Sequence, residues 1–144
     1  DLDQLEMGTR VFAEMGATVV ARDYLDAVES VHTLSRQAAQ WWDDGYDLLL
    51  TPTIPEPPPV LGQFAATEEN PMQAMLRSGM IVPFVAPFNL TGQPAISLPL
   101  HWNADGLPIG VQLVAAYGKE DVLIRIASQL EEARPWKDKR PPVS

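Results

Sequence analysis

The sequence has 144 residues, 46% of them hydrophobic, which is enough for one modest core and too apolar for a disordered tail. The formal net charge of -9 leaves no basic patch to neutralise phosphates, so neither nucleic acid nor an anionic membrane is expected as a partner. The lack of cysteine excludes disulfides and thiol catalysis and fits a cytoplasmic protein, and no apolar run reaches the roughly 20 residues that span a bilayer.

Residues 1–45 are predicted to form two helices. From residue 1 to about residue 15 the apolar residues are spaced irregularly, which predicts a weak helix. Over residues 23–43 the apolar residues recur every three or four positions, which predicts an amphipathic helix. Asp23 is the expected N-cap of this helix and Gly45 its expected stop.

Residues 46–54 are predicted to form a strand buried on both faces, because YDLLLT is a short apolar run between a glycine and a proline. A helix, a tight turn and a buried strand in succession are typical of an α/β sheet, in which ligands meet loops at strand ends. Thr51 and Thr53 stand at such an end. Their hydroxyls either line a binding site or bond the backbone of a turn, and both interpretations stay open.

Residues 55–70 are predicted to form a proline-rich loop. The run PEPPP either stiffens this connection, which we favour, or binds a polyproline-reading domain. A short helix with Pro71 in its first turn is expected next, followed by a loop to residue 94. Residues 80–88 have almost no polar side chain, and their prolines prevent a continuous helix or a central strand, which favours a pocket wall.

Residues 95–117 are predicted to form a β-hairpin, because two apolar segments flank a turn-forming cluster at residues 103–106. The pair Asp105-Gly106 suits a tight reversal. The second arm alternates, so one of its sides should face a core. A last helix is expected over residues 120–134, and residues 135–144 form a charged, peripheral tail.

The runs PFNLTGQPAISLPL and DGLPIGVQLV closely resemble the C-terminal part of the amidase signature family, serine hydrolases that cleave carboxamide C–N bonds. The resemblance extends upstream through YDLLLTPT and downstream to ARPW, so it covers nearly the whole chain. It implies an α/β fold, a mixed-sheet α/β/α sandwich in which residues 1–144 are the C-terminal piece of a single domain.

The family's catalytic groups are a lysine, a serine after a cis peptide bond and a nucleophilic serine in a glycine- and serine-rich loop, and no segment resembles that loop. No catalytic residue is therefore predicted in this chain. Its three lysines have polar surroundings, where a lysine stays protonated and is a poor base. His32 and His101 have no triad or metal-ligand context, so no metal and no cofactor are predicted.

The resemblance implies that the loop before the hairpin, with Asn89 and Gln93, packs near the catalytic centre. Together with the strand-end threonines and the apolar run of residues 80–88, this loop predicts a set of substrate-binding residues. These are Thr51, Thr53, Ile81, Phe84, Phe88, Asn89 and Gln93. No Asp, Glu, Lys or Arg occurs between Arg77 and Asp105, and a charged substrate group buried against such a wall would lose its hydration without gaining a partner. We therefore expect a small-molecule amide with a neutral, partly apolar acyl group.

The sequence leaves two possible functions. The chain is either the C-terminal part of an amidase or an independent, non-catalytic α+β module for binding or oligomerisation. A glycine- and serine-rich loop in the upstream reading frame, with a lysine well before it, distinguishes the first from the second. In the first case the isolated chain exposes sheet edges and apolar faces, so we expect it to self-associate or to bind its missing part.

Overall fold

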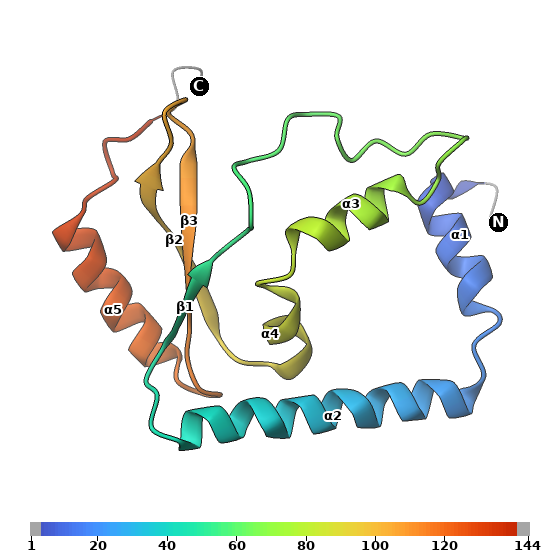
Figure 1. The fold of residues 1–144 in the computed structure, drawn as a ribbon, viewed down its shortest axis with the longest axis horizontal. Helices are drawn as coiled ribbons and strands as arrows, with labels where there is room; N and C mark the ends of the chain where they lie inside the picture. The colour runs from blue at the N-terminus through green and yellow to red at the C-terminus, as the bar shows by residue number, and fades with distance from the viewer. Residues whose placement is uncertain (1–3, 141–144) are drawn as a thin grey trace.

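A computed structural model describes residues 4–140 (Figure 1). The start of the predicted first helix and the end of the predicted tail lie outside this range. The elements in chain order are α1 (Met7–Gly16), α2 (Ala21–Asp43), β1 (Leu49–Pro52), α3 (Gln73–Ile81), α4 (Ala86–Thr91), β2 (Ala95–Trp102), β3 (Pro108–Val114) and α5 (Glu120–Ala133).

Helix α2 begins at Ala21, so the prediction that Asp23 is its N-cap is wrong. Val20 takes the cap position in an extended conformation, without a side-chain hydrogen bond. Asp23 instead lies in the first turn, where its negative charge is favoured by the positive end of the helix dipole. The predicted stop is confirmed, since Gly45 has a φ of 97° and its N–H bonds the Trp42 carbonyl at 3.1 Å.

Strand β1 is shorter than predicted and is not buried on both faces. Leu50 is 65% exposed, and Tyr46 precedes the strand. The reason is the position of β1 at an edge of the sheet, while helix α5 packs over β2 at the opposite edge. The face of β1 that carries Leu50 is therefore uncovered in this chain.

The segment before the hairpin differs from its prediction in two ways. Pro71 lies ahead of α3, whose cap position is taken by Met72. The expected loop contains a further helix, α4, with Pro87 in its first turn, where the missing proline N–H has no intrahelical partner to lose. Gly92 ends α4 with a φ of 80°.

The described strands form one antiparallel sheet in the order β1-β3-β2, and the predicted hairpin of β2 and β3 is confirmed. Gly106 turns it with a φ of 77°. The pairing register shifts between Leu98 and His101, next to Pro99, which has no N–H to donate to the ladder. This proline is tolerated because β2 is an edge strand.

Helix α5 covers one face of the sheet and makes the core with it. The buried side chains of this cluster are Leu98, Leu113, Ala115 and Leu123. Strand residues of the same parity share a face, so Leu113 and Ala115 point to α5 while Gln112 and Val114 point to the opposite face. Both sides of the end of β3 are buried, and the sheet has a second covered face.

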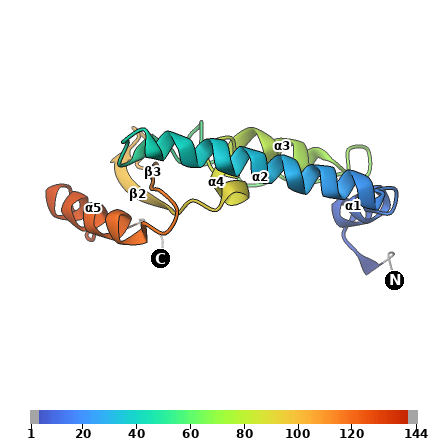
Figure 2. The ribbon, with the colours of Figure 1, turned by 90° about the horizontal axis from the view of Figure 1, so that it is seen from below.

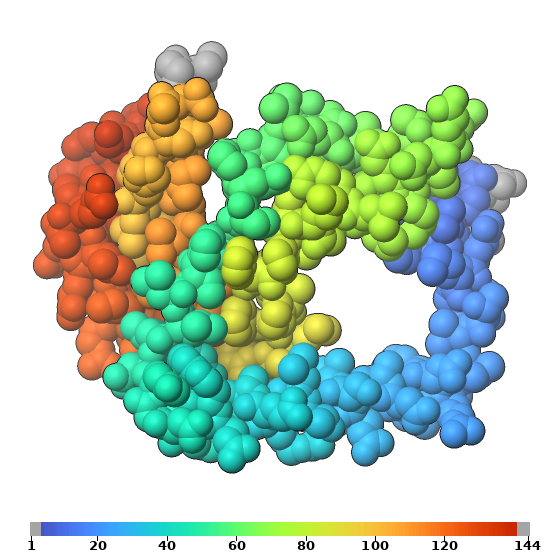
Figure 3. Space-filling view, in the orientation of Figure 1, coloured from blue at the N-terminus to red at the C-terminus, as the bar shows by residue number. Residues whose placement is uncertain are grey.

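The helices α1 to α4 extend away from the sheet in one thin layer (Figure 2), and the space-filling view shows an opening bordered by them (Figure 3). The chain exposes 10630 Å². A compact monomer of its 15.8 kDa mass exposes about 7,300 Å². This chain therefore exposes far more surface than a compact monomer would.

The α/β class is confirmed, with helices spread on both sides of a small sheet. Every helix of the described part is too short or too polar to cross a bilayer.

Candidate functional site

Polar side chains gather on the face of the sheet that points away from α5. Gln112 of β3 pairs with Thr51 of β1 on one side and with Ser97 of β2 on the other, so one row of polar residues crosses all three strands. Thr53 continues β1, and its N–H bonds the carbonyl of Gly110 at 3.0 Å. We call Thr51, Thr53, Ser97 and Gln112 the polar row.

Gln112 joins this row to the segment between α3 and α4. Gln112 as a whole residue is 3% exposed, and its Nε2 donates to the Thr51 hydroxyl at 3.1 Å and to the Phe84 carbonyl at 2.6 Å. An amide NH₂ carries two hydrogens, so both are used. The predicted site residues Thr51 and Phe84 are therefore brought together by a residue that the prediction left out.

Thr53 and Ser97 meet across the central strand. Their hydroxyl oxygens are 2.6 Å apart although β3 separates their strands. Gly110 makes this contact sterically accessible, because a Cβ at its position would lie 2.6 Å from the Thr53 hydroxyl and 2.7 Å from that of Ser97. The absence of a side chain at Gly110 is what lets the two hydroxyls bond.

Replacing Gly110 by alanine is expected to destabilise the sheet by about 1–3 kcal/mol, because the added methyl overpacks the strand and separates the hydroxyls. The Cβ of Thr53, 3.1 Å away, cannot rotate aside. Thermal unfolding measures the effect. Gly79→Ala is the control, since Gly79 lies within α3 with open space at its Cβ position and should lose no stability. Equal midpoints for the two variants would contradict the expectation.

The remaining predicted site residues lie on α3, α4 and the turn that follows. Ile81 ends α3 and Phe88 lies in α4, both half-buried, whereas Asn89 is exposed and its side chain makes no hydrogen bond within the described residues. Gln93 is buried and contacts the Thr91 hydroxyl, which also donates to the Pro87 carbonyl at 2.8 Å. The geometry thus groups Thr51, Thr53 and Phe84 and leaves Asn89 apart.

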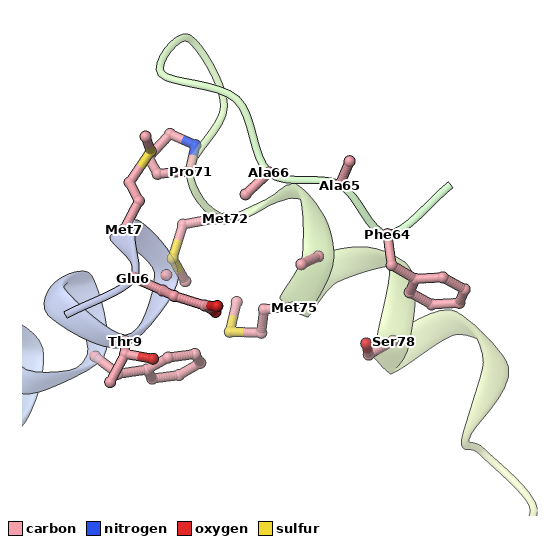
Figure 4. Close-up of a pocket in the computed structure, with 13 residues that line it drawn as sticks. Glu6, Met7, Thr9, Phe64, Ala65, Ala66, Pro71, Met72, Met75 and Ser78 are labelled. Atoms are coloured by element: carbon pink, nitrogen blue, oxygen red, sulfur yellow. The ribbon is translucent and has the colours of Figure 1, made fainter. Parts of the chain in front are cut away.

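A cavity of about 650 Å³ lies elsewhere, between α1, α3 and the loop before α3. Figure 4 shows Met72, Met75 and Glu6 directed into the space between the helices, with Phe64 and Ser78 on the far side. The seven predicted site residues are not among those that line it. Met75 of α3 and Met72 at its cap position thus line a pocket that is separate from the polar row.

Arg77 ties the proline-rich loop to α3. Its guanidinium pairs with the Glu56 carboxylate, bonds the Gln63 side chain at 2.9 Å and lies 5.4 Å from the centre of the Phe64 ring. The Arg77 side chain is largely buried, and a buried charge needs a partner. Glu56 is that partner within the chain. These contacts hold Glu56, Gln63 and Phe64 of the loop against α3.

The described residues contain no group of three or more His, Asp or Glu side chains arranged to hold a metal. Lys139 lies 5.4 Å from the Trp102 ring, at the turn end of the hairpin. The polar row offers hydroxyls and an amide, which can orient a neutral polar group but lack a base to activate a nucleophile.

Sequence reasoning missed Gln112 and Ser97. The signal for Gln112 was present, because it is the one polar side chain in the strand PIGVQLV and falls on the face opposite the apolar alternation. A polar residue at such a position needs a buried partner. Ser97 had no comparable signal, since a serine in an edge strand is ordinary and its contact depends on Gly110.

The chain is similar to the 6-aminohexanoate-cyclic-dimer hydrolase of Paenarthrobacter ureafaciens, with 38% identity over 144 residues that cover 96% of this chain and 29% of the relative. A solved structure of 6-aminohexanoate cyclic dimer hydrolase matches with a TM-score of 0.89 and 37% identity, covering 97% of this chain and 30% of that chain. A crystal structure of an amidase matches with a TM-score of 0.66 and 28% identity, covering 88% and 28%. This chain spans about 30% of the length of the hydrolase structure. The Amidase family model matches residues 4–124, and the chain belongs to the amidase family.

Proposed function

We propose that this chain is the C-terminal part of a longer amidase, which hydrolyses carboxamide C–N bonds. The single observation that carries the proposal is the structural match to the cyclic dimer hydrolase along nearly the whole chain. The preceding part of that longer protein supplies the family's serine, cis-peptide serine and lysine. This chain supplies the sheet face with its polar row and the apolar segment around Phe84.

The proposed reaction has two steps. The serine oxygen attacks the amide carbonyl carbon and loses its proton, the C–N bond breaks, and the leaving amine takes that proton, which leaves an acyl-enzyme. Water then attacks the carbonyl carbon of the ester, the bond to the serine oxygen breaks, and a proton of the water restores the serine hydroxyl as the carboxylic acid is released. Backbone N–H groups of the preceding part stabilise the oxyanion. No step needs a titrating group of this chain.

The proposed substrate is an amide with a neutral, partly apolar acyl group. Residues such as Ile81, Phe84 and Phe88 form the apolar wall, with Thr51, Thr53, Gln93 and Asn89 toward its polar end. The relative is named for a cyclic dimer of 6-aminohexanoate, whose amines and carboxylates are joined in amide bonds. Such a molecule is neutral and aliphatic, which fits a wall without charges.

The exposed surface supports a larger parent. The chain exposes roughly 3,300 Å² more than a compact monomer of its mass. Among the exposed side chains are large apolar ones of α2 and α3, including Leu25, Leu76 and Met80. An area of this size is typical of a permanent interface. We propose that the preceding part of the longer protein covers it. Cytoplasmic location stays a prediction from the sequence.

The isolated chain is expected to hydrolyse nothing, because binding without transition-state stabilisation gives no catalysis. The measurement is release of amine from simple aryl and alkyl amides by residues 1–144 alone and by the longer protein. Only the longer protein should be active. Turnover by the isolated chain that survives substitution of Lys119, Lys137 and Lys139 would contradict the proposal, and an inactive longer protein would favour the binding-module alternative.

A further inference from the structure

The segment around Phe84 is held by few bonds of its own backbone. It lies between Pro83 and Pro87, which have no N–H, and it separates the end of α3 from the start of α4. The N–H groups of Val85 and Ala86 both bond the Val82 carbonyl, which forms a tight turn. The Phe84 carbonyl points out of this turn toward the sheet, where it meets Gln112.

The contact with Gln112 fixes a spacing. Both donated bonds leave the same nitrogen, with lengths of 3.1 Å to Thr51 and 2.6 Å to Phe84. Two near-linear bonds from one planar NH₂ group hold their acceptors about 5 Å apart. The amide therefore sets the distance between strand β1 and the backbone of the apolar wall.

Burial makes this spacing rigid. Gln112 is 3% exposed in the central strand, between Thr51 and Ser97 in the register. Water does not reach a side chain buried this deeply. Breaking either bond therefore leaves a polar group unpaired in the interior. Packed β-strand neighbours on both sides also restrict its rotamers.

We infer that Gln112 is a positioning residue that sets acyl-group specificity by holding the wall at Phe84 at a fixed distance from Thr51. This inference rests on the proposed function. Gln112 need not touch the substrate, since it acts through the Phe84 backbone. Its loss should let the segment between α3 and α4 shift, which alters the fit of a bulky acyl group and hardly affects a small one.

The test is the Gln112→Leu variant of the longer protein, assayed with hexanamide and with acetamide. Leucine keeps the approximate volume and removes both donors. We expect the ratio of kcat/KM for hexanamide to that for acetamide to fall at least about tenfold, mainly through KM for hexanamide. Gln129→Leu, at an exposed position of α5, is the matched control and should keep the unsubstituted ratio.

A second variant keeps the inference falsifiable if Gln112→Leu does not fold. Thr51→Val removes one of the two acceptors with little change of shape, and it should lower the same ratio by a smaller factor. An equal loss of activity toward both amides in either variant would overturn the inference, because that is the signature of a merely structural role. Absence of any amide hydrolysis by the unsubstituted longer protein would overturn the proposed function as well.

Discussion

Replacing Leu123 by alanine is expected to lower the local stability of helix α5 by about 2–5 kcal/mol. Leu123 is 3% exposed and lies in the core between α5 and the sheet, together with Leu98 and Leu113. Alanine would leave a cavity there. Hydrogen exchange of the α5 amides in the longer protein measures the change, because a loss of about 2 kcal/mol makes exchange through local opening about 30-fold faster.

Ile124→Ala is the matched control for this prediction. Ile124 follows Leu123 in the same helix but is 67% exposed, so its truncation should cost little. The two variants share their neighbours, their helix propensities are close, and they differ mainly in burial. Similar exchange rates in α5 for both variants would contradict the assignment of Leu123 to the core.

Periodicity predicted the hairpin and α5 well, because the hairpin pairs segments that are neighbours in sequence and α5 carries a regular apolar stripe. The turn at Gly106 and the core residue Leu123 both follow from local patterns. The exposure of Leu50 was not predictable in this way. An apolar run indicates that a strand can be buried. Whether it is buried depends on the elements that pack against it, and α5 packs over β2 and not over β1.

The candidate site was predictable only in part, for a related reason. Thr51, Thr53 and Phe84 were predicted from strand ends and an apolar run. In the structure, Gln112 on a different strand and the lack of a side chain at Gly110 bring them together. Both depend on sheet register. A sequence without its register does not say which of two alternating faces meets the segment before α4.

The Phe84→Asp variant of the longer protein is expected to lose at least about 100-fold in kcat/KM for a neutral aliphatic or aromatic amide. Phe84 is half-buried beside the polar row, and a carboxylate at this position has no Lys or Arg within residues 78–104 to pair with. Burying a charge without a partner costs several kcal/mol, and the lost ring removes apolar contact as well. Leu61→Asp, which adds the same charge at a fully exposed apolar residue, should keep the unsubstituted kcat/KM.

The same assay with glutamine and asparagine tests the chemistry of the acyl group. Both carry an ammonium and a carboxylate that an apolar wall leaves unsolvated, so the unsubstituted protein should prefer the neutral amides by a wide margin. The aspartate at position 84 should narrow that margin, because it penalises an apolar acyl group and offers a partner to an ammonium. A preference of the unsubstituted protein for glutamine or asparagine would mean that charges from the preceding part dominate the pocket and that the wall at Phe84 does not select the substrate.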